Sequence, residues 1–153
     1  MPTRMQDRIR TAIADAGAIG QWIIPGDAGE FPGFKGAYLL AFRLREPVRL
    51  DIPRLDAVRA MADWYVYAGT ARGSGGIRSR VMRHFRTNKK IHWHIDRLTV
   101  QAAQMAALAV PDGDECGLVG RLLRSRRFTT AIAGFGNTDC RRCKSHLLVW
   151  SSH

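Results

Sequence analysis

Apolar residues recur with a helical period at three places along the chain. Positions 9, 12, 13, 16 and 19 are apolar, and they predict a helix over residues 9–22. Every fourth position from 77 to 85 is apolar, which predicts a second helix there. Because aspartate often caps helix N-termini, Asp114 predicts a third helix that reaches about Leu123.

Short apolar or alternating runs predict strands, which fall at 38–42, 64–67, 91–100, 105–110 and 147–150. Alternation over 48–52, after a turn at Glu46-Pro47, predicts a hairpin with the first of these strands, and a short helical turn is expected at 54–61. Residues 25–33 and the glycines between 69 and 76 predict loops. We find no repeat or long linker, so we expect a single domain over 1–153 that mixes strands and helices.

Composition changes this picture by pointing to a polyanionic partner. The chain has 153 residues, is 46% apolar and carries a net charge of +11, which is typical of a globular and strongly basic protein. Nucleic acid is the commonest partner of such a chain, and an anionic membrane surface comes second. The sequence has no apolar run of about 18 residues, no signal-like N-terminus and an odd number of cysteines, so we expect an intracellular, cytoplasmic protein that does not enter a membrane.

The positive charge is concentrated between Trp64 and Ile95, where no Asp or Glu occurs. Side chains that can neutralise phosphates cluster in this stretch: Arg72, Arg78, Arg80, Arg83, Arg86, Lys89 and Lys90. Further basic groups follow at Arg121, Arg124, Arg126 and Arg127, and again at Arg141, Arg142 and Lys144. The pattern favours nucleic-acid binding over the alternative, a solvated basic face without a partner.

Two candidate features lie within this basic stretch. The glycines at 73–76 feed the second predicted helix and could cradle a phosphate, although a tight turn explains them equally well. Arg80 and His84 are four residues apart, so they lie one turn apart on the same helix side. There they could clamp a phosphate and move a proton, or simply form a charged edge.

Two groups of residues could hold a metal. On the strand expected at 91–100, His92, His94 and Asp96 would share one face and could bind zinc or manganese, or could brace the active face as a polar network. Near the C-terminus, Cys140, Cys143 and His146 have zinc-like spacing, with a fourth ligand available from Cys116 or His153; packing cysteines or a redox pair are the alternatives. Glu115 is either a carboxylate that favours a helix start or a metal ligand.

The stretch Gly36-Ala37-Tyr38 resembles the first half of the signature of GIY-YIG nucleases, and Tyr67-Ala68-Gly69 resembles the second half. Both central isoleucines of the signature are alanine here. The two tyrosines are 29 positions apart, farther than in most members of that family.

The helix expected at 77–85 is similar to the catalytic helix of the same family, with Arg80 followed by His84. Glu115 stands where the family has its metal-binding glutamate. The order of strands and helices is also similar, so the resemblance implies an α/β (α+β) fold, in which helices flank a small, mostly antiparallel central sheet.

A more specific resemblance is to an uncharacterised branch of the family and extends nearly to the C-terminus. The branch has a glycine insertion, a Lys-rich turn into His-Trp-His-Ile-Asp and a C-terminal Cys/His run, which correspond here to residues 73–76, 89–96 and 134–146. Some members are fused to helix-hairpin-helix DNA glycosylases, which implies a DNA-repair setting and a repair enzyme as partner.

The resemblance implies a DNA endonuclease that hydrolyses phosphodiester bonds in single-stranded or structured DNA. Glu115 would bind Mg²⁺ or Mn²⁺, Tyr38 would deprotonate water beside Tyr67, Arg80 would stabilise charge, and His84 would relay a proton. Two alternatives stay open. The chain could be a nucleic-acid-binding module without catalysis, or a zinc-dependent metallohydrolase built on His92, His94 and Asp96.

Overall fold

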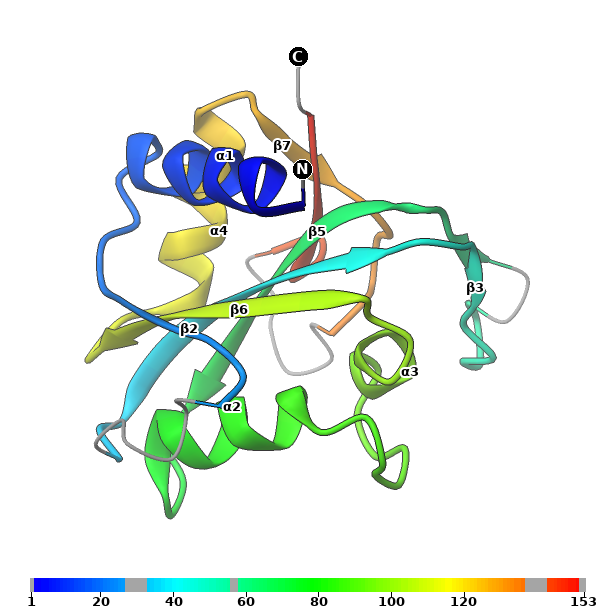
Figure 1. Cartoon of the computed structure of the whole chain (residues 1–153), viewed down its shortest axis with the longest axis horizontal. Coiled ribbons are helices and arrows are strands. Elements are labelled where there is room, and N and C mark those ends of the chain that lie inside the picture. Colours follow the sequence, from blue (N-terminus) through cyan, green and yellow to red (C-terminus); the bar gives the residue numbers. More distant parts are fainter. Residues whose placement is uncertain (1, 27–32, 56–57, 137–142, 152–153) are drawn as a thin grey trace.

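The computed structural model describes residues 2–26, 33–55, 58–136 and 143–151. Within them a six-stranded antiparallel sheet has the order β1-β6-β2-β5-β8-β7 (Figure 1). Its strands are β1 (Gln21–Ile23), β2 (Gly36–Leu44), β5 (Asp63–Ala71), β6 (Gln104–Pro111), β7 (Phe128–Thr130) and β8 (Leu147–Trp150). The described helices are α1 (Pro2–Asp15), α2 (Gly76–Phe85), α3 (Asp96–Thr99) and α4 (Glu115–Arg124). The expected α+β class with an antiparallel sheet is confirmed.

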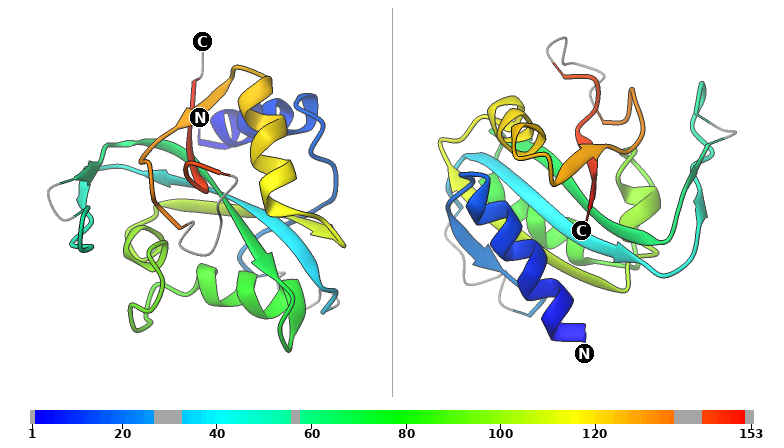
Figure 2. Two further views of the ribbon diagram at one scale, coloured as in Figure 1. Left: turned by 180° about the vertical axis from the view of Figure 1, so that it is seen from behind. Right: turned by 90° about the horizontal axis from the view of Figure 1, so that it is seen from above.

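Helices cover both faces of the sheet, so its central strands are buried on both sides. Figures 1 and 2 show α2 and α3 on one face and α1 and α4 on the other. In β2, Tyr38, Leu40 and Phe42 enter the core under α2, while the alternate residues Ala37, Leu39 and Ala41 enter the core under α1 and α4. This double burial explains why β2 reads as a continuous apolar run.

The first helix begins and ends earlier than the sequence predicted. It ends at Asp15, because the backbone at Gly17 turns into the left-handed region with φ of 95°. The remainder of the predicted helix contains β1, where Trp22 pairs with Leu108 of β6. A Cβ at Gly20 would collide with the carbonyl oxygen of Ala109, so this glycine permits the close approach of the two backbones.

The hairpin predicted between 38–42 and 48–52 is wrong. The partner of β2 is β5, and the register places Tyr38 opposite Gly69 and Leu40 opposite Tyr67. The segment at 48–52 instead forms β3 (Val48–Arg49), which pairs with β4 (Arg59–Ala60), so the helical turn expected at 54–61 is wrong too. This small sheet projects to one side of the molecule (Figure 1).

The strand predicted at 91–100 is also wrong, because this segment forms a turn followed by α3. The backbone N–H groups of His92 and Trp93 both donate to the carboxylate of Asp96, at 2.9 Å each, which folds the chain back on itself. Ile95 and Leu98 then point into the core from the helical turn, three residues apart. The apolar run therefore has a helical rather than an alternating pattern.

Candidate active site and Cys/His cluster

A buried tyrosine–histidine pair lies under α2. The hydroxyl of Tyr38 and Nε2 of His84 are 2.5 Å apart, and both side chains are almost fully buried. A Cβ at Gly69, opposite Tyr38 in the sheet, would overlap the phenol ring, so glycine is required there. The structure therefore brings together Tyr38 and His84, which the sequence analysis had singled out. The alternative for His84, a charged edge of the helix in solvent, does not fit its burial.

Burial controls protonation of this pair. Burial, together with the positive charge of Lys89, lowers the pKa of His84 to about 3, so its ring is neutral at pH 7. Burial, then the neighbouring Tyr67, raises the pKa of Tyr38 well above 10, while Arg80 opposes this shift. At neutral pH the pair therefore holds one phenolic proton next to an uncharged imidazole.

Tyr67 lies beside the pair on the same face of the sheet, two residues along β5 from Gly69. Its ring meets His84 edge-on at 6.2 Å and Phe135 at 6.4 Å. Burial raises the pKa of Tyr67 to about 12; the charge of Arg80 lowers it, and Asp96 and Glu115 raise it. The charges of Arg80 and Glu115 therefore both influence the pKa of Tyr67, in opposite directions.

Trp93 organises the arginines of α2. The guanidinium carbon of Arg80 lies 4.5 Å from the centre of the Trp93 ring and that of Arg83 lies 4.8 Å from it. Such cation–π contacts hold a guanidinium in place while leaving its N–H groups able to bind another acceptor. No role was predicted for Trp93; an aromatic residue just after a basic stretch was the signal that could have identified it.

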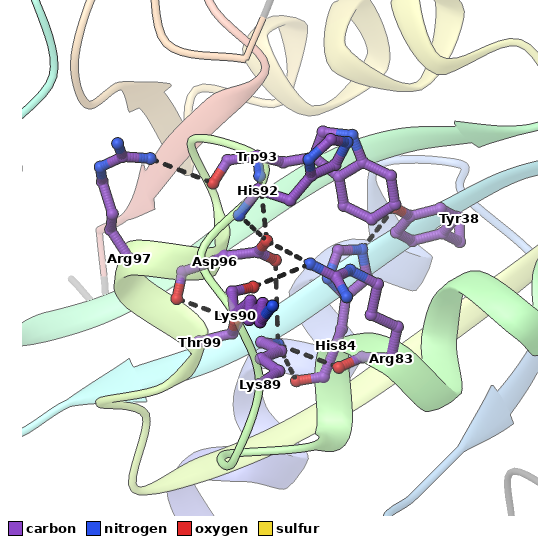
Figure 3. Close-up of polar contacts among 10 residues, drawn as sticks. All are labelled: Tyr38, Arg83, His84, Lys89, Lys90, His92, Trp93, Asp96, Arg97 and Thr99. Carbon is purple, nitrogen blue, oxygen red and sulfur yellow. Dashed lines mark hydrogen bonds and ion pairs between the residues drawn. The ribbon is translucent and has the colours of Figure 1, made fainter.

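Asp96 is the centre of a buried polar network (Figure 3). Its carboxylate accepts from Arg83 at 2.7 Å as well as from the N–H groups of His92 and Trp93, and Nζ of Lys89 lies 3.9 Å away. Burial alone would raise the pKa of Asp96, but these hydrogen bonds outweigh burial and hold the pKa below its usual value. Asp96 is therefore the internal counter-charge of the acid-free stretch that it ends.

Two residues predicted to contact nucleic acid are engaged inside the protein. The side chain of Lys89 is 3% exposed and donates to the carbonyls of Arg83 and His84 at 2.9 and 3.1 Å, at the C-terminus of α2. Burial lowers its pKa to about 8. Arg83 is half-buried against Asp96. The surface role expected of Lys89 is thus contradicted by its burial, whereas Arg72, Arg78, Arg86 and Lys90 are exposed.

The last glycine of the loop, Gly76, packs against backbone. A Cβ at Gly76 would overlap the carbonyl oxygens of Gly33 and Phe34. The first N–H of the helix beyond it, at Ile77, already donates to the carbonyl of Phe34 at 2.8 Å. Gly76 therefore joins the start of α2 to residues 33–34, which favours the structural interpretation for this part of the loop.

The histidines at 92 and 94 do not form a metal site with Asp96, because the three residues do not share a strand face. His92 is exposed and packs on Trp93, whereas Nδ1 of His94 accepts from the N–H of Gly136 at 3.2 Å. The carboxylate of Asp96 is fully buried. Among the described residues they do not cluster as ligands, so the zinc-hydrolase alternative loses its geometric basis.

Glu115 is the first residue of α4 and is half-buried. Asp114 caps this helix, as predicted: its carboxylate accepts from the N–H of Gly117 at 3.1 Å. Carboxylate oxygens of Asp114 and Glu115 lie within 4.8 Å of each other and of Sγ of Cys116. Oxygen donors of this kind fit a hard divalent cation, and a carboxylate in the first turn is also stabilised by the helix dipole.

A second group of ligand atoms shares Cys116 with the first. Sγ of Cys116, Sγ of Cys143 and a ring nitrogen of His146 all lie within 4.8 Å of one another, and this Cys/His cluster could hold a metal ion. Cys143 and His146 belong to the motif singled out in the sequence, and Cys116 is one of the fourth ligands considered for it. Cys140 and His153 lie outside the described residues.

Sequence reasoning missed the wall formed by residues 135 and 136. Phe135 is fully buried and its ring contacts Tyr67 and His94, while a Cβ at Gly136 would crowd the Tyr67 ring. The Gly-Phe-Gly pattern at 134–136 was noted only through the resemblance, so its contact with Tyr67 is a finding of the structure.

Fold and site together define a small basic α+β protein with a buried tyrosine–histidine pair and a Cys/His cluster. The chain belongs to the family described as "Domain of unknown function DUF123", whose model matches residues 37–153. No curated protein and no solved structure matches the chain. The family has no assigned activity, so the resemblance to GIY-YIG nucleases stays a prediction. Within the described residues, no helix is long and apolar enough to cross a membrane.

Proposed function

We propose that this chain is a metal-dependent endonuclease of the GIY-YIG type that hydrolyses DNA phosphodiester bonds. The observation that carries the proposal is the buried hydrogen bond between Tyr38 and His84, with Tyr67 and Arg80 beside it. A solvated surface patch would not need these side chains buried in contact with one another. Residues from three separate parts of the chain, Tyr38 of β2, Tyr67 of β5 and His84 of α2, are in contact here.

The pair supplies a base whose pKa depends on nearby charge. A tyrosine with a raised pKa does not ionise at pH 7, so Tyr38 takes up base work only when positive charge approaches it. Arg80 already lowers the pKa of both tyrosines. His84 is neutral and bonded to the phenol oxygen, so it keeps that oxygen oriented and can share its proton.

Glu115 is the residue that we propose for the catalytic ion. Its carboxylate is half-buried, lies near a second carboxylate and helps to raise the pKa of Tyr67, so it offers oxygen ligands while its charge reaches Tyr67. Mg²⁺ or Mn²⁺ bound there would polarise a phosphate and lower the pKa of water. Arg80 would stabilise negative charge on the phosphate.

The exposed face of α2 fits a DNA backbone. Arg78 and Arg86 point to solvent from this helix, Lys90 follows it, and no acid occurs between positions 64 and 95. Such a surface binds phosphates by releasing counterions. Single-stranded or branched DNA is the substrate class that we favour, in a DNA-repair setting with a repair enzyme as partner.

We propose zinc as the ion for the Cys/His cluster of Cys116, Cys143 and His146. Thiolate and imidazole are the donors that zinc prefers, whereas Mg²⁺ and Mn²⁺ prefer carboxylate oxygens. The two groups of ligand atoms are therefore suited to different metals, one catalytic and one structural.

The proposal is tested with labelled single-stranded, duplex and branched DNA in Mg²⁺, Mn²⁺ or EDTA. The wild-type chain should cut in either metal and not in EDTA, and Glu115→Gln should not cut. Asp112→Asn, which changes an exposed acid just before α4, is the control and should cut normally. Salt-sensitive binding without cleavage under any metal would instead identify a binding module.

A further inference from the structure

The three ligand atoms of the Cys/His cluster come from two separate parts of the chain. Cys116 is the second residue of α4, next to Glu115, whereas Cys143 and His146 precede β8. Nε2 of His146 and Sγ of Cys116 are 3.8 Å apart. Tetrahedral zinc with its usual bond lengths separates a sulfur and a nitrogen ligand by roughly 3.6 Å, so the spacing fits with little movement.

The surroundings of the cluster are those of a site held by the fold. His146 is buried, Cys116 is half-buried, and Cys143 packs against the core under α1 and α4. Three protein ligands suffice to hold zinc, with a fourth position left for water or another donor. Cys140, three positions before Cys143, lies outside the described residues.

The backbone of His146 connects the Cys/His cluster to β5, which carries Tyr67, and to Phe135, which packs on Tyr67. Its carbonyl accepts from the N–H of Ala68, the residue after Tyr67, at 2.9 Å. Its N–H donates to the carbonyl of Phe135 at 3.0 Å, and the ring of Phe135 packs on Tyr67. A displacement of His146 would therefore be transmitted directly to the surroundings of Tyr67.

We propose that a zinc ion bound by Cys116, Cys143 and His146 fixes the start of α4, and with it Glu115, against the wall that packs on Tyr67. Zinc joins the element that carries the carboxylate to the segment that supports the tyrosine. These ligands are positioning residues, because they contact the zinc and not the DNA. The positioning role rests on the proposed nuclease function, whereas zinc binding does not.

Zinc binding is tested first, on the full chain purified under reducing conditions. Metal analysis should find one zinc per wild-type chain, and Co²⁺ in its place should give a thiolate-to-cobalt charge-transfer band. Cys116→Ser and His146→Asn should lose the ion, while His92→Asn, an exposed histidine outside the cluster, should keep it. Zinc bound normally by Cys116→Ser, or its absence from wild type, would overturn the proposal.

Alkylation of the wild-type chain tests the same site without a variant that could fail to fold. Bound zinc should protect Cys116 and Cys143 from a thiol reagent, and a chelator should remove the protection. Two thiols that react equally fast with and without zinc, or that prove to be joined as a disulfide, would contradict the site.

The positioning role is tested by hydrogen exchange and by cleavage at a fixed Mg²⁺ concentration. Zinc removal should speed exchange in peptides covering 114–118 and 131–136 more than in peptides from α2, and should slow cleavage. Zinc bound without any effect on these peptides would contradict the positioning role. A chain that binds zinc and shows the exchange change but cuts no DNA would instead contradict the nuclease function alone.

Discussion

At the scale of single residues, Asp96 is the side chain on which the site depends most for its stability. It is fully buried, and its carboxylate accepts hydrogen bonds from two backbone N–H groups and from the guanidinium of Arg83. Asp96→Asn would leave Arg83 and Lys89 without their counter-charge, so we expect a loss of about 3 kcal/mol in the free energy of unfolding. Urea denaturation measures this loss.

The matched control is Asp51→Asn. Asp51 also pairs with an arginine, Arg49 at 3.2 Å, but both side chains are largely exposed. Exposed ion pairs contribute little, so a change below about 1 kcal/mol is expected. Asn also tolerates the positive φ of 53° at this position. Equal losses in the two variants would show that the Asp96 network is not special.

His84 makes stability depend on pH in a defined window. Its pKa is about 3 in the folded chain against 6.5 for an ordinary histidine. Between these values the unfolded state binds the extra proton, so wild-type stability should fall as the pH drops below 6.5. Relative to His84→Gln, which does not titrate, the loss should approach about 1.4 kcal/mol per pH unit. Denaturation curves between pH 7 and pH 4 measure it; parallel pH profiles would contradict burial of a neutral ring.

Sequence reasoning identified individual residues where their type restricted their chemistry. Arg80 and His84 stood out by type and spacing, Tyr38 stood out through the family resemblance, and the structure brings Tyr38 and His84 into contact beside Arg80. For Asp96 the alternative of a polar network is confirmed and the metal site is wrong, whereas Trp93 was missed, because its role depends on a turn that the sequence pattern does not reveal. A carboxylate that ends an acid-free stretch was a signal for this network.

At the scale of elements, the join between α2 and residues 33–34 depends on Gly76. Its φ is 61°, and a Cβ there would overlap the carbonyls of Gly33 and Phe34. Gly76→Ala should therefore cost about 1–3 kcal/mol in the free energy of unfolding. A thermal melt compares it with Gly73→Ala, where a Cβ meets nothing within 4 Å. Equal melting temperatures would contradict the close approach.

The elements were predictable where their apolar pattern was local. Strands β2, β5, β6 and β8 and helices α2 and α4 form where the sequence indicated them. Pairing partners were not predictable, because β2 pairs with β5 across an intervening pair of strands. The strand predicted at 91–100 was wrong because a short apolar run does not by itself distinguish a buried strand from a helical turn. The turn before α3 was not recognised from the sequence.

At the scale of the whole molecule, two basic faces are candidates for the DNA contact of the proposed function. Arg78 lies on α2 and Arg86 caps its C-terminus, whereas Arg121 and Arg124 lie on α4, which covers the other face of the sheet (Figure 2). We expect the double alanine variant on α2 to lower the slope of log affinity against log salt by about 2, and the pair on α4 to leave it unchanged. Binding titrations at several salt concentrations decide between the faces. A slope altered only by the α4 pair would move the binding surface to the opposite face.

The central claim is that the buried Tyr38–His84 pair performs catalysis, and removal of one hydroxyl tests it most directly. Tyr38→Phe keeps the ring under α2 but removes the oxygen bonded to His84. Tyr65→Phe is the matched control, because Tyr65 is also buried in the sheet but its hydroxyl donates to the carbonyl of Met61. With Mg²⁺ and branched DNA, Tyr38→Phe should cut roughly 10² to 10⁴ times more slowly than wild type, and Tyr65→Phe should cut normally. Wild-type cleavage by Tyr38→Phe, with both proteins folded, would contradict the claim.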